Sequence, residues 1–200
     1  MDNSFTKKYL ESEIEILKKL DAEKIDKAIS QLKFSKDNGG RVFVLGLGGG
    51  AAHALHFTAD LRKLAKIDAK SPVENISEFT ALVNDEGWNN SFKKYLERNI
   101  LGKNDTLIII SVGGGDEEKN VSVNIVKAVE FSKLAGCKSI SISGREKGFA
   151  NRNCDISILI DVSDKNMITP HTEGVQSVIL HLIASHPELC EVKPKWESLG

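Results

Sequence analysis

The sequence has few cysteines and almost no net charge. Its three cysteines, Cys137, Cys154 and Cys190, are odd in number and far apart, which excludes a disulfide framework and the paired spacing of a zinc finger. We expect free thiols in a reducing compartment. A formal net charge of −1 gives no overall attraction to nucleic acid or to an acidic membrane surface, so we expect neither partner.

Long apolar runs and low-complexity segments are also absent. No apolar run approaches the ~20 residues that cross a bilayer. The chain opens on Met1–Ser4 and becomes charged at once, so we expect no signal peptide and a cytoplasmic location. The 200 residues, of which 40% are hydrophobic, are sufficient for one domain with a full core.

What the sequence does contain is a regular alternation of strand and helix patterns. The run Arg41–Leu45 is short, apolar and β-branched, as expected of a buried strand. A helical pattern follows at Ala51–Leu64. Further strands are expected at Thr106–Ser111, Ser139–Ser143 and Ile156–Ile160, and further helices at Val121–Ala135 and Glu173–Ser185. This alternation predicts an α/β fold with a doubly wound, flavodoxin-like parallel sheet and helices on both faces.

The N-terminal segment has a different pattern. Apolar residues recur at helical spacing over residues 5–37 with charges between them, which predicts one or two amphipathic helices. Such helices need a partner surface, in this domain or in another subunit. We divide the chain into helices at 1–40, a sheet domain at 41–192 and a loosely held tail at 193–200.

Two predicted strands end in glycine-rich turns that open helices. In a parallel sheet such turns lie at the carboxyl edge, where ligands bind. Glycine allows close approach of the backbone, and a helix N-terminus offers free N–H groups to an anion. The candidate binding residues are Gly48, Gly49 and Gly50 in the first turn, and Ser111, Gly113, Gly114, Gly115 and Asp116 in the second.

The first turn is open to three interpretations. Residues Gly46–Ala51 fit the dinucleotide pattern G-x-G-x-x-A. A dinucleotide site needs a strand ending in an acid about 20 residues later. Asp68 is near that position, but Lys66–Lys70 is a poor strand. The turn is otherwise either purely structural or a site for a sugar or sugar phosphate, and we favour the sugar site.

Several segments resemble one family in consistent order. Gly46–Leu61 (GLGGGAAHALHFTADL) resembles a motif of the phosphoheptose isomerases, G-N-G-G-S followed by H-F-x-x-E-L. Ala81–Trp88, with Asn84 and Asp85, resembles their A-x-x-N-D-x-G-aromatic stretch. The second glycine turn falls where that family has a serine-rich phosphate loop. The resemblance spans roughly residues 5–190 and implies the SIS (sugar isomerase) fold and a homotetramer with sites between subunits.

The resemblance also implies a site of four side chains. His56 and Asp60 stand four residues apart on one helix, so both point from one face. Glu173 and His181 stand eight apart on the last helix, roughly on one face. The family has His and Glu at the first pair, and Gln and His at the second. Two imidazoles and two carboxylates suit Zn²⁺ or another divalent ion.

The implied reaction is an aldose–ketose isomerisation of a sugar phosphate, sedoheptulose 7-phosphate to a heptose 7-phosphate. Asp60 and His181 would be its acid/base pair, and a metal would support the enediolate. From the residues alone, His56 with Asp60 could be a solvated helix pair and His181 a core histidine. Two further hypotheses remain open: a non-catalytic SIS module that binds a sugar ligand or a protein partner, and an isomerase for an atypical sugar.

The sequence departs from the family's pattern at several positions. Asp60 replaces a glutamate, and Gly50 replaces the serine of the first turn. The phosphate loop has lost its hydroxyls except Ser111, and Asp116 stands where we expect a helix N-cap. Arg145 and Lys147, after the third predicted strand, are the nearest candidates to hold a phosphate.

Overall fold

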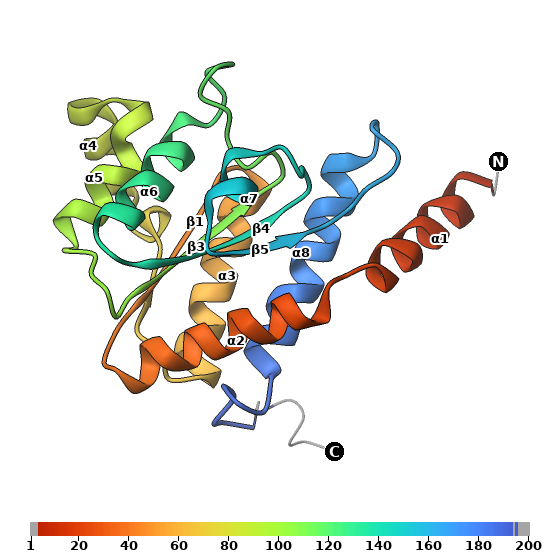
Figure 1. Ribbon diagram of the computed structural model, residues 1–200, viewed down its shortest axis with the longest axis horizontal. Coiled ribbons are helices and arrows are strands. Elements are labelled where there is room, and N and C mark those ends of the chain that lie inside the picture. The colour runs from red at the N-terminus through yellow and green to blue at the C-terminus, as the bar shows by residue number, and fades with distance from the viewer. Residues whose placement is uncertain (1–3, 194, 196–200) are drawn as a thin grey trace.

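The computed structural model describes residues 4–193 and residue 195, and it contains one parallel sheet (Figure 1). The strand order is β2-β1-β3-β4-β5, which is the flavodoxin-like order. The predicted fold class is therefore confirmed. The strands are β1 (Val42–Gly46), β2 (Ala69–Lys70), β3 (Thr106–Ser111), β4 (Lys138–Ser143) and β5 (Ile156–Leu159).

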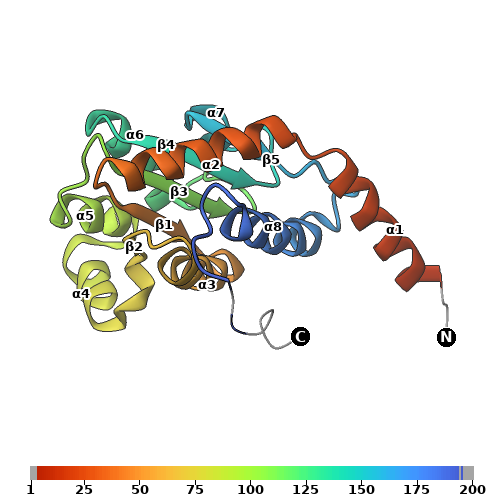
Figure 2. The same cartoon turned by 90° about the horizontal axis from the view of Figure 1, so that it is seen from below.

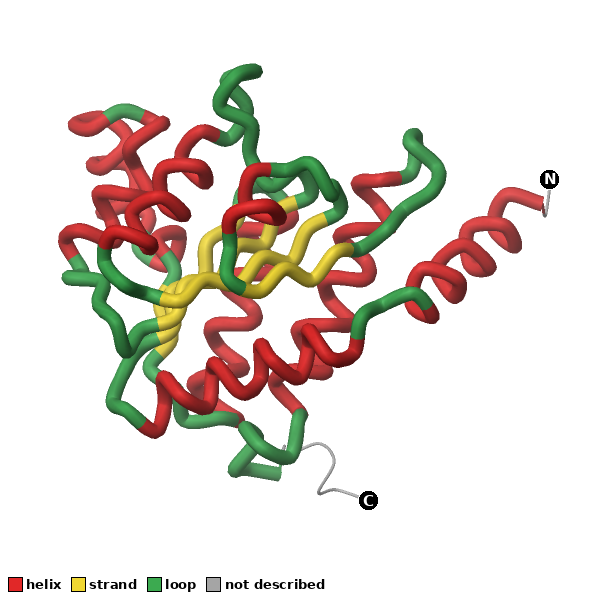
Figure 3. Tube along the Cα trace, in the orientation of Figure 1, coloured by secondary structure: helices red, strands yellow, loops and turns green. Residues whose placement is uncertain are grey.

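Eight α-helices and two short 3₁₀ turns complete the described part of the chain. Most of the helices cover the two faces of the sheet, as Figure 3 shows. The helices are α1 (Ser4–Lys18), α2 (Ala22–Asp37), α3 (Gly49–Leu64), α4 (Ile76–Glu86), α5 (Ser91–Arg98), α6 (Val123–Leu134), α7 (Phe149–Asn153) and α8 (Ile168–Ser185), and the 3₁₀ turns are Pro72–Glu74 and Trp88–Asn90.

The two faces of the sheet are filled by alternate residues of the same strands. In β1, Val42 and Val44 pack with α2, α3 and α8, while Phe43 and Leu45 pack with α5 and α6. All four of these side chains are fully buried. Successive side chains of a strand point to opposite faces, so a strand that is apolar throughout has to be covered on both sides. This explains why the buried runs were recognisable in the sequence.

The predicted strands agree with the observed ones to within one residue at most ends. The helix expected from Glu173 begins earlier, at Ile168, because Pro170 lies in its first turn, where a missing N–H removes no intrahelical bond. The segment Lys66–Lys70 does contain a strand, but only its last two residues pair with β1. That pairing is parallel, as in the rest of the sheet.

The two N-terminal helices have different surroundings. α2 belongs to the core, because its residues Ile25, Ile29 and Leu32 are buried with the sheet residues of one face. α1 extends away from the sheet (Figures 1 and 2) and buries only Ile16. The predicted boundary at residue 40 therefore marks no gap in packing, and most of the predicted tail at 193–200 lies outside the described residues.

None of the helices in the described ranges is long and apolar enough to cross a membrane. The expected cytoplasmic location stays a prediction.

A buried ion pair joins the start of β1 to the turn before β3. Asp105 is 4% exposed and accepts from the Arg41 guanidinium at 2.8 Å and from the amides of Arg41 and Gly102 at 2.7 and 2.9 Å. The hydrogen bond to Asp105 raises the pKa of Arg41 above its ordinary value. The same guanidinium also donates to the carbonyls of Asn99 and Ile100.

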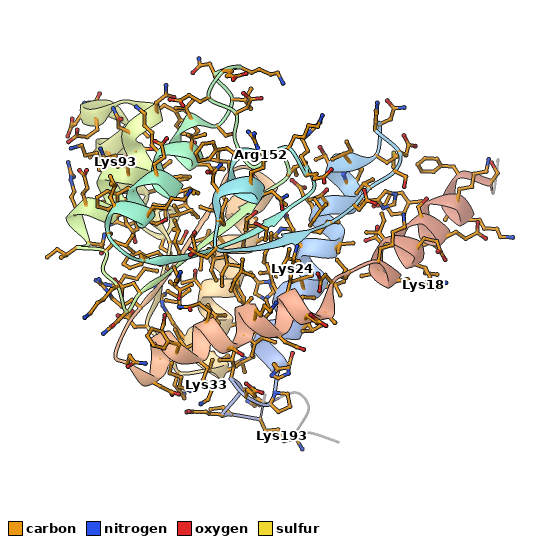
Figure 4. The ribbon with its side chains drawn as sticks, viewed as in Figure 1. Lys18, Lys24, Lys33, Lys93, Arg152 and Lys193 are labelled. Atoms are coloured by element: carbon orange, nitrogen blue, oxygen red, sulfur yellow. The ribbon has the colours of Figure 1, made fainter. Side chains whose placement is uncertain are left out.

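We predict that Asp105→Ala lowers the free energy of unfolding by about 3 kcal/mol, because it leaves a half-buried guanidinium and two amides without their acceptor. Urea unfolding followed by circular dichroism measures this change. The matched control is Lys33→Ala, which removes an exposed pair with Asp37 on α2 (Lys33 is labelled in Figure 4) and should change stability by less than about 0.5 kcal/mol. Equal effects of the two substitutions would contradict the assignment.

Candidate active site

The first glycine turn lets α3 start in direct contact with the sheet. A Cβ at Gly46 would lie 2.1 Å from the carbonyl oxygen of Gly50, and a Cβ at Gly50 would lie 2.4 Å from the carbonyl oxygen of Ile110. Both neighbours are backbone atoms, so neither position has room for a side chain in this packing. The serine of the related motif therefore has no place at residue 50, and glycine there lets α3 lie close to β3.

Three of the predicted site residues meet where α3 lies beside α8 (Figure 2). The Oδ2 atom of Asp60 lies 3.4 Å from Nε2 of His56 and 3.6 Å from Nδ1 of His181. The two imidazole rings contact each other edge to face, with centroids 4.9 Å apart. The Asp60 side chain is 19% exposed, whereas both histidines are more than half exposed. The three groups are thus close together and accessible to a ligand.

This cluster has the spacing of a three-ligand metal site. One ligand atom from each of His56, Asp60 and His181 lies within 4.8 Å of the other two. Ligands held about 2.0–2.2 Å from a tetrahedral zinc ion lie about 3.3–3.6 Å from one another, and two of the three separations already match. Three protein ligands with an open fourth position are the arrangement of catalytic rather than structural zinc.

Glu173 does not join this cluster in one chain. Its carboxyl group lies over the first turn of α3, where a Cβ on Gly49 would come within 2.5 Å of it. Eight residues of helix rise about 12 Å, so Glu173 and His181 stand at different levels of α8 although their spacing is close to two turns. The expected convergence of four side chains is therefore not seen within one subunit, because the prediction considered the face of the helix and neglected the rise.

The second glycine turn is held by hydrogen bonds on both sides. The hydroxyl of Ser111 accepts from the amide of Gly114 at 3.0 Å. The amides of Phe149 and Ala150, at the start of α7, donate to the carbonyls of Gly115 and Gly114. Gly114 and Gly115 have φ values of 73° and 83°, which disfavour other residues. The turn is therefore fixed against α7.

Asp116 is not the N-cap of the following helix, contrary to the prediction. Its backbone pairs with Val121 in an antiparallel bridge, so residues 116–121 form a closed loop that projects from the sheet (green, at the top of Figures 1 and 3). Its carboxylate accepts from the backbone amide of Lys119 at 3.0 Å and pairs with the Lys119 ammonium at 3.2 Å. The hydrogen bonds from Lys119 lower the pKa of Asp116.

The residue at the N-cap of α6 is Ser122, which was not predicted from the sequence. Because the loop closes on itself, Gly115 and Ser122 become neighbours, and a Cβ on Gly115 would lie 3.2 Å from the Ser122 carbonyl oxygen. The Ser122 side chain makes no capping hydrogen bond to α6. The signal in the sequence was the polar run of residues 116–120, which separates the glycines from the first buried residue of the helix.

A cleft of about 580 Å³ lies between this loop and the segment after β4. Arg145 and Lys147 line it, together with Gly113 and Gly115 of the second turn. The two basic residues proposed from sequence are therefore next to the turn, as expected. Asp116 and Lys119 line the same cleft from the other side.

Asn84 and Asp85 are exposed near the end of α4, and the amide of Asn84 donates to the Asp85 carboxylate at 2.9 Å. Within the described residues, neither forms a hydrogen bond or ion pair with the other predicted site residues. A role for them in substrate binding stays a prediction.

A dinucleotide site in the first turn does not fit this geometry. Asp68 is exposed and precedes β2, so it lies at the opposite end of that strand from the position that contacts a ribose.

The cysteines offer no nucleophile to the site. All three are free, as expected, and burial raises the pKa of Cys137 and of Cys154 to about 12. These two thiols stay protonated and unreactive at neutral pH.

Comparison with known proteins agrees with the fold. The SIS domain family matches residues 8–144. Phosphoheptose isomerases of Aliarcobacter butzleri and Helicobacter pylori are 29% and 30% identical to this chain, over 92% of it and over 95% and 93% of their own lengths. The solved phosphoheptose isomerase of Neisseria gonorrhoeae is similar with a TM-score of 0.76 and 25% identity, over 90% of this chain and 94% of that one.

These relatives confirm the prediction of an enzyme of the isomerase class. The matches extend over nine-tenths or more of both chains. The chain belongs to the SIS domain family and, within it, to the phosphoheptose isomerases.

Proposed function

We propose that this protein is an aldose–ketose isomerase that converts sedoheptulose 7-phosphate to a heptose 7-phosphate. The observation that carries the proposal is the cluster of His56, Asp60 and His181, which two packed helices hold within 4.8 Å. A carboxylate between two imidazoles is able both to accept and to donate protons, as an isomerisation requires. The family of relatives supplies the substrate class.

In the proposed reaction, Asp60 removes the proton on the carbon next to the carbonyl group and returns it to the neighbouring carbon. His181 donates a proton to the carbonyl oxygen and accepts one from the adjacent hydroxyl, so no net proton is lost. Its Nδ1 atom lies 3.6 Å from the Asp60 carboxylate, and the two groups can therefore act on adjacent atoms of one substrate. His56, on the other side of Asp60, orients the carboxylate.

A metal ion fits the same three side chains, with His56, Asp60 and His181 as its ligands. A bound Zn²⁺ ion would polarise the carbonyl group and stabilise the enediolate. A carboxylate that binds a cation is a weaker base. Asp60 would then remove a proton less readily, and the share of the proton transfers that falls to His181 would change. Glu173 could join the ligand set only from another copy of the chain.

We further propose that one complete site needs two copies of the chain. From Gly49 to Asp60, α3 rises about 16 Å, whereas an extended seven-carbon sugar phosphate is only about 10 Å long, given C–C bonds of about 1.5 Å. A substrate whose phosphate lies at the first glycine turn therefore does not reach Asp60 of the same chain. A second copy would bring its own cluster to that substrate.

Exposed apolar side chains support such an assembly. Leu55, Val178 and Leu182 are 39–46% exposed around the cluster on α3 and α8, and Phe5, Leu10 and Ile14 are 51–63% exposed on α1. Exposed apolar side chains that gather on one surface are typical of interfaces. We propose a homotetramer.

A non-catalytic module is the weaker alternative, because a binding module needs no carboxylate between two histidines.

The first prediction concerns turnover. Asp60→Asn and His181→Gln should each lower kcat/KM for sedoheptulose 7-phosphate by about 10²–10⁴-fold, because each removes one proton-transfer group. Chromatographic analysis of the heptose products measures this effect. His186→Gln, just after the end of α8 and outside the cluster, is the control and should leave the rate unchanged. Absence of turnover by the wild type over a range of metal ions would defeat the proposal.

The second prediction concerns metal. Purified protein equilibrated with zinc should hold about one ion per chain, and its affinity should fall as the pH is lowered, because protons compete for the imidazoles. His56→Ala and His181→Ala should reduce the metal content measured by elemental analysis. Glu173→Gln is the informative comparison: unchanged content means three ligands from one chain, and reduced content means a fourth ligand from a partner. A protein whose melting temperature does not respond to zinc would contradict the site.

The third prediction concerns assembly. Light scattering should give about four times the chain mass of 21.9 kDa. Leu182→Glu should lower that mass by placing a charge in the proposed interface. Leu134→Glu, at an apolar residue of α6 that is 83% exposed, is the matched control and should not. A wild-type monomer at micromolar concentration would rule the assembly out.

A further inference from the structure

The cleft of about 580 Å³ beside the second glycine turn has an uneven charge distribution. Its lining includes three cationic side chains, Lys119, Arg145 and Lys147, and two carboxylates, Asp116 and Glu146. The Asp116 carboxylate is already occupied, because it pairs with the ammonium and the backbone amide of Lys119. This leaves Arg145 and Lys147 facing one carboxylate.

Arg145 and Lys147 are cations without a partner among the described residues. Both are exposed at the rim of the cleft, and neither forms an ion pair with any residue in the described part of the chain. Their backbone, in contrast, is fixed: the amide of Gly148 donates to the Arg145 carbonyl, and Gly148 lies so close to the turn that a Cβ there would be 2.3 Å from the Gly113 carbonyl oxygen. The two positive charges are thus held next to the glycine turn.

The first glycine turn has the opposite character. The carboxyl group of Glu173 lies against Gly49, at the N-terminus of α3. A helix N-terminus favours an anion, but here a carboxylate of the protein already lies at that place. A second anion would be repelled from it. The carboxyl edge of the sheet therefore has one turn that disfavours an anionic ligand and one turn flanked by two cations that the described residues leave unpaired.

We propose that Arg145 and Lys147 bind the phosphate group of the substrate, and that they replace by charge the hydroxyl groups that this chain's second turn has lost. The inference rests on the proposed function for the identity of the substrate, but not for the existence of the anion site. Arg145 presents a planar fork of donors suited to phosphate oxygens, and Lys147 supplies a second charge.

Binding that depends on charge has a measurable signature. It weakens as ionic strength rises, because salt screens exposed charges. It also favours a phosphorylated sugar strongly over the free sugar. The carboxylate of Glu146 opposes phosphate binding, because Glu146 stands between Arg145 and Lys147 in the sequence and lines the same cleft.

The experiment is isothermal titration of the wild type with inorganic phosphate, sedoheptulose 7-phosphate and unphosphorylated sedoheptulose. We expect Arg145→Gln and Lys147→Gln each to raise the Kd for both phosphate compounds about tenfold, and Glu146→Gln to lower it. Arg152→Gln is the matched control, because Arg152 is an exposed arginine on α7 outside the cleft (Figure 4). Melting temperatures check that each variant is folded.

The outcomes separate this inference from the proposed isomerase. Phosphate binding that Arg145→Gln and Lys147→Gln weaken supports the anion site, even in a protein that turns over no heptose phosphate. Turnover of sedoheptulose 7-phosphate with KM unchanged in both variants overturns the anion site and leaves the isomerase intact. A wild type that binds neither phosphate compound, or a loss as large in Arg152→Gln, also overturns the site.

Discussion

The close approach of α3 to the sheet is the constraint on which the rest of this structure depends. Gly46 and Gly50 have no side chains, so the first turn of the helix lies on the backbone of β1 and β3. This close approach fixes the position of every later residue of α3 relative to the sheet. Phe57 and Leu61 consequently reach the core, and His56 and Asp60 come out on the flank that α8 covers. A shift of the helix outward would carry His56 and Asp60 together and separate both from His181 on α8.

How much of this was predictable depends on the range of the interactions. The strands were predictable because a buried parallel strand is apolar on both faces, and β3 (Thr106–Ser111) shows this within six residues. The pair His56 and Asp60 was predictable because four residues are one helical turn. The rise of about 12 Å between Glu173 and His181 also follows from their spacing. The position of Glu173 against Gly49 does not, because it depends on how α8 packs along α3. The prediction that Asp116 is an N-cap was wrong for a related reason. The backbone bridge between Asp116 and Val121 decides where α6 starts.

The α3–α8 pair also carries different chemical groups at its two levels. At the level of the glycine turns, the two helices present Glu173 and polar backbone. About two to three turns further on, they present the carboxylate and imidazoles of the proposed chemistry. Two groups this far apart on one pair of packed helices do not meet within one chain, which is why the proposed site takes groups from two copies. The exposed apolar residues of α1, which has little contact with the rest of its own chain, agree with this view.

The closed loop at residues 116–121 has a consequence for how such a protein can change over evolutionary time. Because the backbone pairing of Asp116 with Val121 brings the loop's ends together, the chain enters and leaves it at almost the same point. Residues can be gained, lost or exchanged at its tip while the strand before it and the helix after it keep their positions. An exchange of residues at the tip would therefore alter one wall of the cleft and leave the helices that carry His56, Asp60 and His181 in place.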